Sequence, residues 1–99
     1  MQNYRNESID NLFKVMLKLK SVDECYDFFE DLCTVKEILD MAQRFETAVL
    51  LNDGCSYQKI SENIGISTAT ISRVNRSLNY GSGGYKKAIQ SLGEEQNDN

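Results

Sequence analysis

A short stretch in the second half of the chain, GISTATISRVNRSL (residues 65–78), gathers side chains that can bind a nucleic acid. On a helix, Ile71, Val74 and Leu78 fall on one face at intervals of three and four residues. The other face carries short polar and basic side chains, namely Thr68, Ala69, Thr70, Ser72, Arg73 and Arg76. Hydroxyl and methyl groups suit base edges in a DNA groove, and guanidinium groups suit phosphates. The pattern predicts a helix that reads DNA, although hydroxyls alone would indicate only a solvated face.

The residues just before this stretch complete a helix-turn-helix, which we place at about residues 56–78. Ile60 and Ile64 face inward on a first helix, and the small Ser61 allows the second helix to cross closely. Gly65 provides the backbone freedom that the turn needs, and Ile66 plugs the core beneath it. Three polar residues at the start of the first helix complete the predicted DNA-binding set: Ser56, Gln58 and Lys59.

The charge distribution supports this interpretation, although the whole chain has a net charge of −4. Residues 56–87 carry five basic side chains and a single acidic one, Glu62, whereas residues 1–55 carry eleven acidic and six basic side chains. Lys86 and Lys87 add to the basic region but are equally consistent with a solvated surface. A local basic region matters more for binding phosphates than the total charge does. We therefore expect double-stranded DNA as a partner.

Other functions are less well supported by the composition. A purely structural helical hairpin, or a helical protein–protein interaction module with an acidic N-terminal half, remains open as an alternative. The chain has no His, no phosphate-binding glycine loop and no cluster of metal ligands, so we expect no enzyme, no catalytic residue, no metal and no cofactor. Three cysteines, Cys25, Cys33 and Cys55, lack CxxC spacing and are expected to be free and mostly buried.

No stretch approaches the roughly 18 consecutive apolar residues that a membrane span needs. The first ten residues, MQNYRNESID, also lack the apolar core of a signal peptide. We therefore expect a cytoplasmic protein with no membrane partner.

The remaining sequence predicts an all-α protein with one domain over residues 1–92 and a disordered acidic tail over residues 93–99. Apolar periodicity and the lack of proline predict helices at about 8–20, 21–33, 34–52, 56–64, 67–78 and 85–92. Ser21-Val-Asp-Glu24 and Thr34-Val-Lys-Glu37 have the pattern of capping boxes. The helix at 34–52 is apolar on more than one face, which favours burial against a second subunit.

These motifs together resemble the bacterial Trp repressor family, and more closely its Trp-repressor-like proteins of the YerC/YecD type. The resemblance extends from about Thr34 to Tyr80, and its most diagnostic part is the Ala-Thr-Ile-Ser-Arg run of the second helix. Upstream it includes Glu37, Arg44, Leu50, Leu51 and Gly54, with this chain one residue shorter between Gly54 and Ile60. The resemblance implies an intertwined homodimer and a transcriptional repressor that acts by occluding its operator.

The resemblance also implies a site for a small-molecule corepressor, whose identity the sequence does not give. In the Trp repressor the ligand lies between two arginines, with a threonine and a serine at its ends. Arg44, Arg73, Thr34 and Ser77 occupy the matching positions. The family has a glycine directly after the second arginine, where this chain has Val74, and this departure argues against tryptophan as the ligand. From its own helix alone, Arg44 could equally form an ion pair with Asp40 or Glu37.

Overall fold

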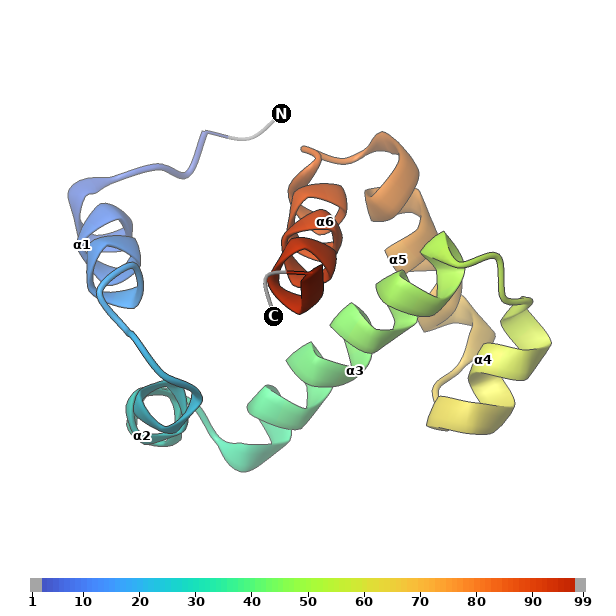
Figure 1. Cartoon of the computed structure of the whole chain (residues 1–99), viewed down its shortest axis with the longest axis horizontal. Coiled ribbons are helices and arrows are strands. Elements are labelled where there is room, and N and C mark those ends of the chain that lie inside the picture. Colours follow the sequence, from blue (N-terminus) through green and yellow to red (C-terminus); the bar gives the residue numbers. More distant parts are fainter. Residues whose placement is uncertain (1–2, 98–99) are drawn as a thin grey trace. The chain divides into compact units, whose positions relative to one another are not determined.

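The computed structural model describes residues 3–97 of the chain. Within these residues the backbone forms six α-helices and no strand (Figure 1), which confirms the predicted all-α class. The helices are α1 (Glu7–Met16), α2 (Val22–Leu32), α3 (Val35–Asn52), α4 (Tyr57–Ile64), α5 (Thr68–Tyr80) and α6 (Gly84–Asn97).

Hydrogen bonds from side chains to the backbone fix the starts of α2 and α3. The hydroxyl of Ser21 accepts a hydrogen bond from the backbone N–H of Glu24 at 3.1 Å. At α3 the exchange is reciprocal: the Thr34 hydroxyl accepts from the Glu37 N–H at 3.1 Å, and the Glu37 carboxylate accepts from the Thr34 N–H at 2.8 Å. These hydrogen bonds satisfy backbone donors that a helix start leaves without a partner. The predicted capping box at Thr34 is confirmed, whereas at Ser21 only its N-cap half is formed and the Glu24 carboxylate instead accepts from the Ser21 hydroxyl at 3.5 Å.

The first helix is shorter than the sequence indicates. Asn6 caps it, with its side-chain oxygen accepting from the Ile9 N–H at 2.9 Å, and the helix ends at Met16 rather than near Lys20. Beyond this point, backbone N–H groups bond to carbonyl groups three residues back, the tighter pattern common at helix ends. The apolar periodicity therefore continues past the helix, because it records which residues avoid water and not where the helical hydrogen bonds stop.

The chain divides into two compact units, Met1–Ile38 and Leu39–Asn99. No residue of α1 or α2 is buried. Val22 and Tyr26 belong to the apolar periodicity that predicted the helix at about 21–33, which favours burial of both, but these side chains are 71% and 57% exposed. Cys25 is exposed as well, and Cys33 and Cys55 are only half-buried, so the expectation of mostly buried thiols is wrong, although all three cysteines are free as predicted. The apolar stripe of α2 is left without a cover in this unit.

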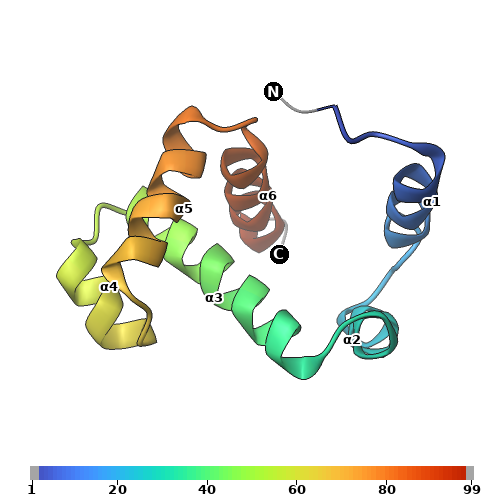
Figure 2. The same cartoon turned by 180° about the vertical axis from the view of Figure 1, so that it is seen from behind.

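The second unit contains the hydrophobic core. Its fully or almost fully buried apolar side chains are Ala48, Ile60, Ile71, Val74 and Leu78. They come from α3, α4 and α5, and α5 packs against α4 at one end and α6 at the other (Figure 2). The buried hydroxyl of Thr47 donates to the carbonyl oxygen of Gln43 at 2.7 Å, so it carries no unsatisfied polar group into the core.

Glycine residues follow the ends of α3 and α5 in this unit. α3 ends at Asn52, and Gly54 adopts a φ of +89°, a left-handed conformation that avoids a steric penalty only without a Cβ atom. α5 ends before Gly81, where a Cβ atom would overlap the carbonyl oxygen of Ser77. α6 then extends to Asn97, past the predicted end at Leu92, so residues 93–97 of the expected tail are helical.

Candidate nucleic-acid interface

The turn between α4 and α5 is held by both backbone and side chain. Gly65 has a φ of +82° and its N–H bonds to the carbonyl oxygen of Ser61 at 2.8 Å, which ends α4. The Ser61 hydroxyl donates to the carbonyl oxygen of Ile66 at 2.8 Å across the turn. Ser61 thus does more than provide space for a crossing helix, because its hydroxyl ties the turn to α4. Ile66 is half-buried beneath the turn, as expected for a residue that plugs the core.

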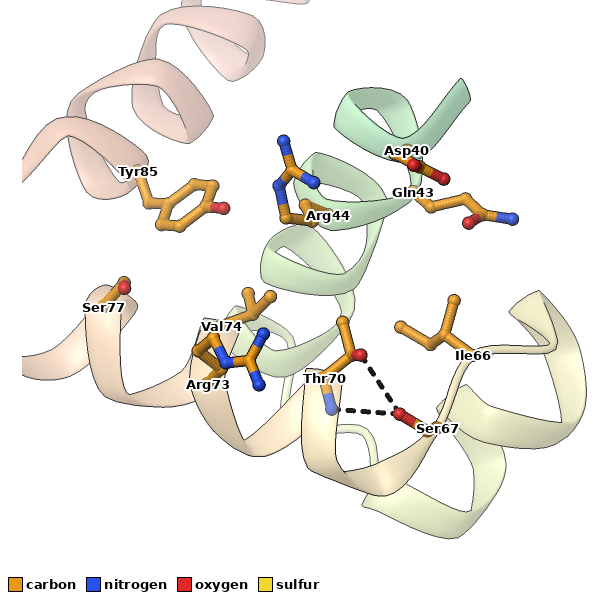
Figure 3. Close-up of a pocket in the computed structure, with 10 residues that line it drawn as sticks. All are labelled: Asp40, Gln43, Arg44, Ile66, Ser67, Thr70, Arg73, Val74, Ser77 and Tyr85. Atoms are coloured by element: carbon orange, nitrogen blue, oxygen red, sulfur yellow. Dashed lines mark hydrogen bonds between the residues drawn. The ribbon is translucent and has the colours of Figure 1, made fainter. Parts of the chain in front are cut away.

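The start of α5 is defined by Ser67. Its hydroxyl accepts from the backbone N–H of Thr70 at 3.2 Å and lies 3.0 Å from the Thr70 hydroxyl (Figure 3). This N-cap occupies one of the free backbone donors at the helix start and fixes the Thr70 side chain toward Ser67. Thr70 is half-buried, whereas the neighbouring Thr68 and Ser72 are exposed.

The remaining predicted DNA-reading residues of α5 form one exposed set: Thr68, Ala69, Ser72, Arg73 and Arg76. The opposite face of the same helix is buried through Ile71, Val74 and Leu78. Burial of these three side chains fixes which face of α5 meets solvent. The arrangement places small and hydroxyl-bearing groups at the helix start and basic groups further along, as the sequence indicated.

The three predicted residues near α4 are exposed, but two of them also have local partners. Ser56 is the N-cap of α4, and its hydroxyl accepts from the Lys59 N–H at 3.2 Å. Gln58 donates to the carboxylate of Glu62, one turn further along, at 3.2 Å. The Ser56 hydroxyl still has its O–H to donate and the Gln58 amide has a second N–H group, so both side chains can still donate to a phosphate oxygen.

A pocket of about 530 Å³ opens between α3, α5 and α6. Its lining residues are Asp40, Gln43, Arg44, Ile66, Ser67, Thr70, Arg73, Val74, Ser77 and Tyr85 (Figure 3). Arg44, Arg73 and Ser77, predicted from the family resemblance as effector-binding residues, therefore line one pocket. The fourth, Thr34, belongs to the N-terminal unit, where its hydroxyl caps α3, and its role in a ligand site stays a prediction.

Neither arginine of the pocket is neutralised by a carboxylate. Among the residues that the structure describes, Arg44 and Arg73 form no hydrogen bond or ion pair, and Figure 3 shows none between them and the other lining residues. The ion pair within α3 that the sequence allowed for Arg44 is thus not formed. Asp40 lines the pocket but is already engaged in another interaction.

Sequence reasoning missed Tyr85 as a pocket residue. It extends from α6 into the pocket, with its hydroxyl toward Arg44 (Figure 3), and it is half-buried. A single tyrosine after a glycine-rich turn has no periodicity or spacing to connect it to residues on two other helices. Only the packing of α6 against α5 shows that this side chain belongs to the pocket.

Comparison with known proteins assigns this arrangement to a family. The family model described as Trp repressor protein matches residues 7–93, almost the whole chain. The chain belongs to the Trp repressor family. It is 48% identical over 94 residues to the uncharacterized protein YerC of Bacillus subtilis (strain 168), an alignment that covers 95% of this chain and 90% of YerC.

Solved structures agree with this assignment to the Trp repressor family. The crystal structure of a TrpR-like protein from Eubacterium eligens ATCC 27750 superposes with a TM-score of 0.87 at 53% identity, covering 90% of this chain and 92% of that one. A second crystal structure, from Staphylococcus aureus, gives a TM-score of 0.86 at 43% identity, with 90% and 89% covered. The predicted resemblance to YerC-type Trp-repressor-like proteins is therefore confirmed.

Family membership decides the broad functional class. Trp repressors are bacterial, non-enzymatic, DNA-binding regulators with a helix-turn-helix, so the prediction that this protein is not an enzyme is confirmed. In the described part of the chain, no helix is long and apolar enough to cross a membrane.

Proposed function

We propose that this protein is a homodimeric, sequence-specific repressor of transcription that acts in the cytoplasm by occluding its operator. The observation that carries the proposal is the two-sided character of α5. Ile71, Val74 and Leu78 are buried, while the helix start and both arginines remain exposed. No acidic side chain is present on α5 itself to repel phosphates.

The mechanism follows from the charges and the geometry of the helix start. The exposed N-terminal residues of α5 enter the major groove, where Thr68 and Ala69 are small enough for close approach to base edges. Arg73 and Arg76 bind phosphates and orient the helix on the duplex. DNA occupied in this way is closed to the transcription machinery, and this makes repression the simplest regulatory outcome.

A second subunit is supported by the surface of the N-terminal unit. Large apolar side chains in α1 and α2 and directly after α1 are exposed, Leu17 at 85% among them, and soluble proteins rarely leave such surface uncovered. Several apolar residues of α3 are only half-buried or exposed as well, including Leu39 and Met41. A dimer that covers them presents two copies of α5, and the half-sites should lie about 34–36 Å apart, as helix-turn-helix dimers of this kind require.

The test is selection of bound sequences from a random duplex library with the full-length protein. We expect a pseudo-palindromic motif to be enriched by the wild type and lost in Ala69→Glu, which places a carboxylate on the exposed start of α5 without touching the core. Gln90→Glu is the matched control, because it changes the charge by the same amount at an exposed position of α6. A wild type that enriches no sequence would contradict the proposal, and sedimentation as a monomer at micromolar concentration would contradict the dimer.

A further inference from the structure

Glu62 is the single acidic side chain in the basic region of residues 56–87. It is exposed in the last turn of α4, where the negative end of the helix dipole disfavours a carboxylate. A negative charge next to a phosphate-binding surface also lowers the affinity for any DNA. Neither the stability of α4 nor attraction to phosphates therefore explains an acid at this position.

The contacts of Glu62 connect it to the predicted DNA-binding residues of α4. Its carboxylate accepts a hydrogen bond from the side-chain amide of Gln58, one turn earlier, at 3.2 Å. Lys59 lies only three residues before Glu62 but forms no ion pair among the described residues, so its ammonium group stays available to a phosphate. Because a carboxylate has no proton to donate, Glu62 holds the nitrogen end of the Gln58 amide and leaves the second N–H group for another acceptor.

We propose that Glu62 increases the discrimination between the operator and other DNA, an inference that rests on the proposed function. Its carboxylate orients the Gln58 amide, whose second N–H group donates to a phosphate of the operator backbone. Its charge repels phosphates wherever the protein docks without that contact. Specificity is a difference between two affinities, so repulsion in the wrong complexes contributes to it as attraction in the right complex does.

The two effects act on different DNA because the two kinds of complex differ in order. Non-specific binding is held mainly by charge, so the Glu62 carboxylate meets phosphates in many registers. In the operator complex the phosphate contacts fix the register of the protein, and the contact made by Gln58 offsets the repulsion by Glu62. The repulsion is modest, since two unit charges about 10 Å apart in water change an equilibrium constant by roughly twofold.

The first measurement compares the affinities of the full-length protein for an enriched duplex and for a duplex of random sequence, at one salt concentration. Glu62→Gln should bind the random duplex about two- to fourfold more tightly, as expected when one or two phosphates lie near the removed charge. The enriched duplex should change less, so the ratio of the two affinities falls. Glu94→Gln, an equal change of charge at an exposed position of α6, should leave the ratio unchanged. An unchanged or higher ratio in Glu62→Gln would overturn the proposal.

Two further variants separate the charge of Glu62 from its hydrogen bond. Glu62→Asp keeps the charge on a side chain that is one methylene group shorter, so it should weaken the enriched duplex at least about twofold and leave the random duplex unchanged. Gln58→Ala should weaken the enriched duplex at least as much, and the double variant should bind no more weakly than Gln58→Ala, because both changes remove one contact.

Additive effects of Glu62→Asp and Gln58→Ala would show that Glu62 does not act through Gln58 and would overturn the positioning role. A wild type that enriches no duplex would refute the proposed function. A wild type that enriches a duplex, with a ratio of affinities that does not respond to Glu62→Gln, would refute this inference alone.

Discussion

Ile71 offers a quantitative test of how α5 is held in place. Its side chain is 0% exposed and lies on the buried face of the reading helix, in a core that also contains the fully buried Ile60. Ile71→Val removes one methylene group and should cost about 0.5–1.5 kcal/mol of the free energy of unfolding. Ile71→Ala leaves a larger cavity and should cost about 2–5 kcal/mol. The total stability expected for a domain of this size is only about 5–15 kcal/mol, so the second change is a large fraction of it.

The assay is thermal unfolding followed by circular dichroism, at one fixed protein concentration because a dimer's stability depends on concentration. In a domain of about 100 residues each kcal/mol lowers the melting temperature by about 4–8 °C. Ile71→Val should therefore melt roughly 4–8 °C lower for a loss of about 1 kcal/mol, and Ile71→Ala at least about 8 °C lower. Thr68→Ala, at an exposed position of the same helix, should change stability by no more than about 0.5 kcal/mol.

DNA binding should show the opposite sensitivity at the two positions, with the larger effect at Thr68 and the smaller effect at Ile71. Thr68→Ala removes a group from the exposed helix start and should weaken binding of an enriched duplex, whereas Ile71→Val should leave it intact at temperatures where the protein stays folded. An Ile71→Ala protein as stable as Thr68→Ala would refute the assignment of the buried face, and with it the orientation of α5.

Three further outcomes follow from the same geometry. Ser67→Ala removes the N-cap of α5 and should lower the free energy of unfolding by about 1 kcal/mol in urea titration; no change would mean that water replaces the cap without cost. Gly65→Ala places an alanine in a left-handed conformation in open space and should lower the free energy of unfolding by about 1–2 kcal/mol. Gly81→Ala places a Cβ atom against the Ser77 carbonyl group and should lower it by more, and the reverse order would contradict the path of the backbone at the end of α5. Arg76→Gln should weaken DNA binding similarly for all sequences and reduce the slope of log affinity against log salt by about 1, and an unchanged slope would exclude a phosphate contact at this position.

The features that the sequence predicted well are those decided over a few residues. Burial of Ile60, Ile71 and Leu78 follows from helical spacing, since these side chains can leave water only on one face. The N-caps at Ser21 and Thr34 follow in the same way from a hydroxyl and a carboxylate three residues apart. The left-handed Gly65 was expected because a tight turn between crossing helices leaves few alternatives to glycine.

The features that were missed depend on distant parts of the chain. The apolar stripe of α2 shows that Val22 and Tyr26 would be stabilised by a cover, but the periodicity does not say whether another helix of the same chain supplies it. Tyr85 is the corresponding case in the pocket, because its proximity to Arg44 results from the path of the chain after Gly81. Local patterns predict which surfaces need partners, and only the fold, or an assembled dimer, determines what those partners are.

Arg73 lies where the exposed face of α5 meets the pocket between α3, α5 and α6. It follows a buried residue, Ile71, by two positions and precedes the buried Val74, so its side chain leaves α5 at the border between the core and the exposed face. A basic side chain in the middle of the exposed face would lie away from the pocket. A basic side chain closer to the core would line the pocket but lie away from the exposed face. At the border the same side chain lines the pocket and also belongs to the exposed face, and it has no ion-pair partner among the described residues. A change at Arg73 therefore alters both surfaces at once, and DNA reading is tested more cleanly at Ala69 or Arg76, which are exposed on α5 and lie outside the pocket lining.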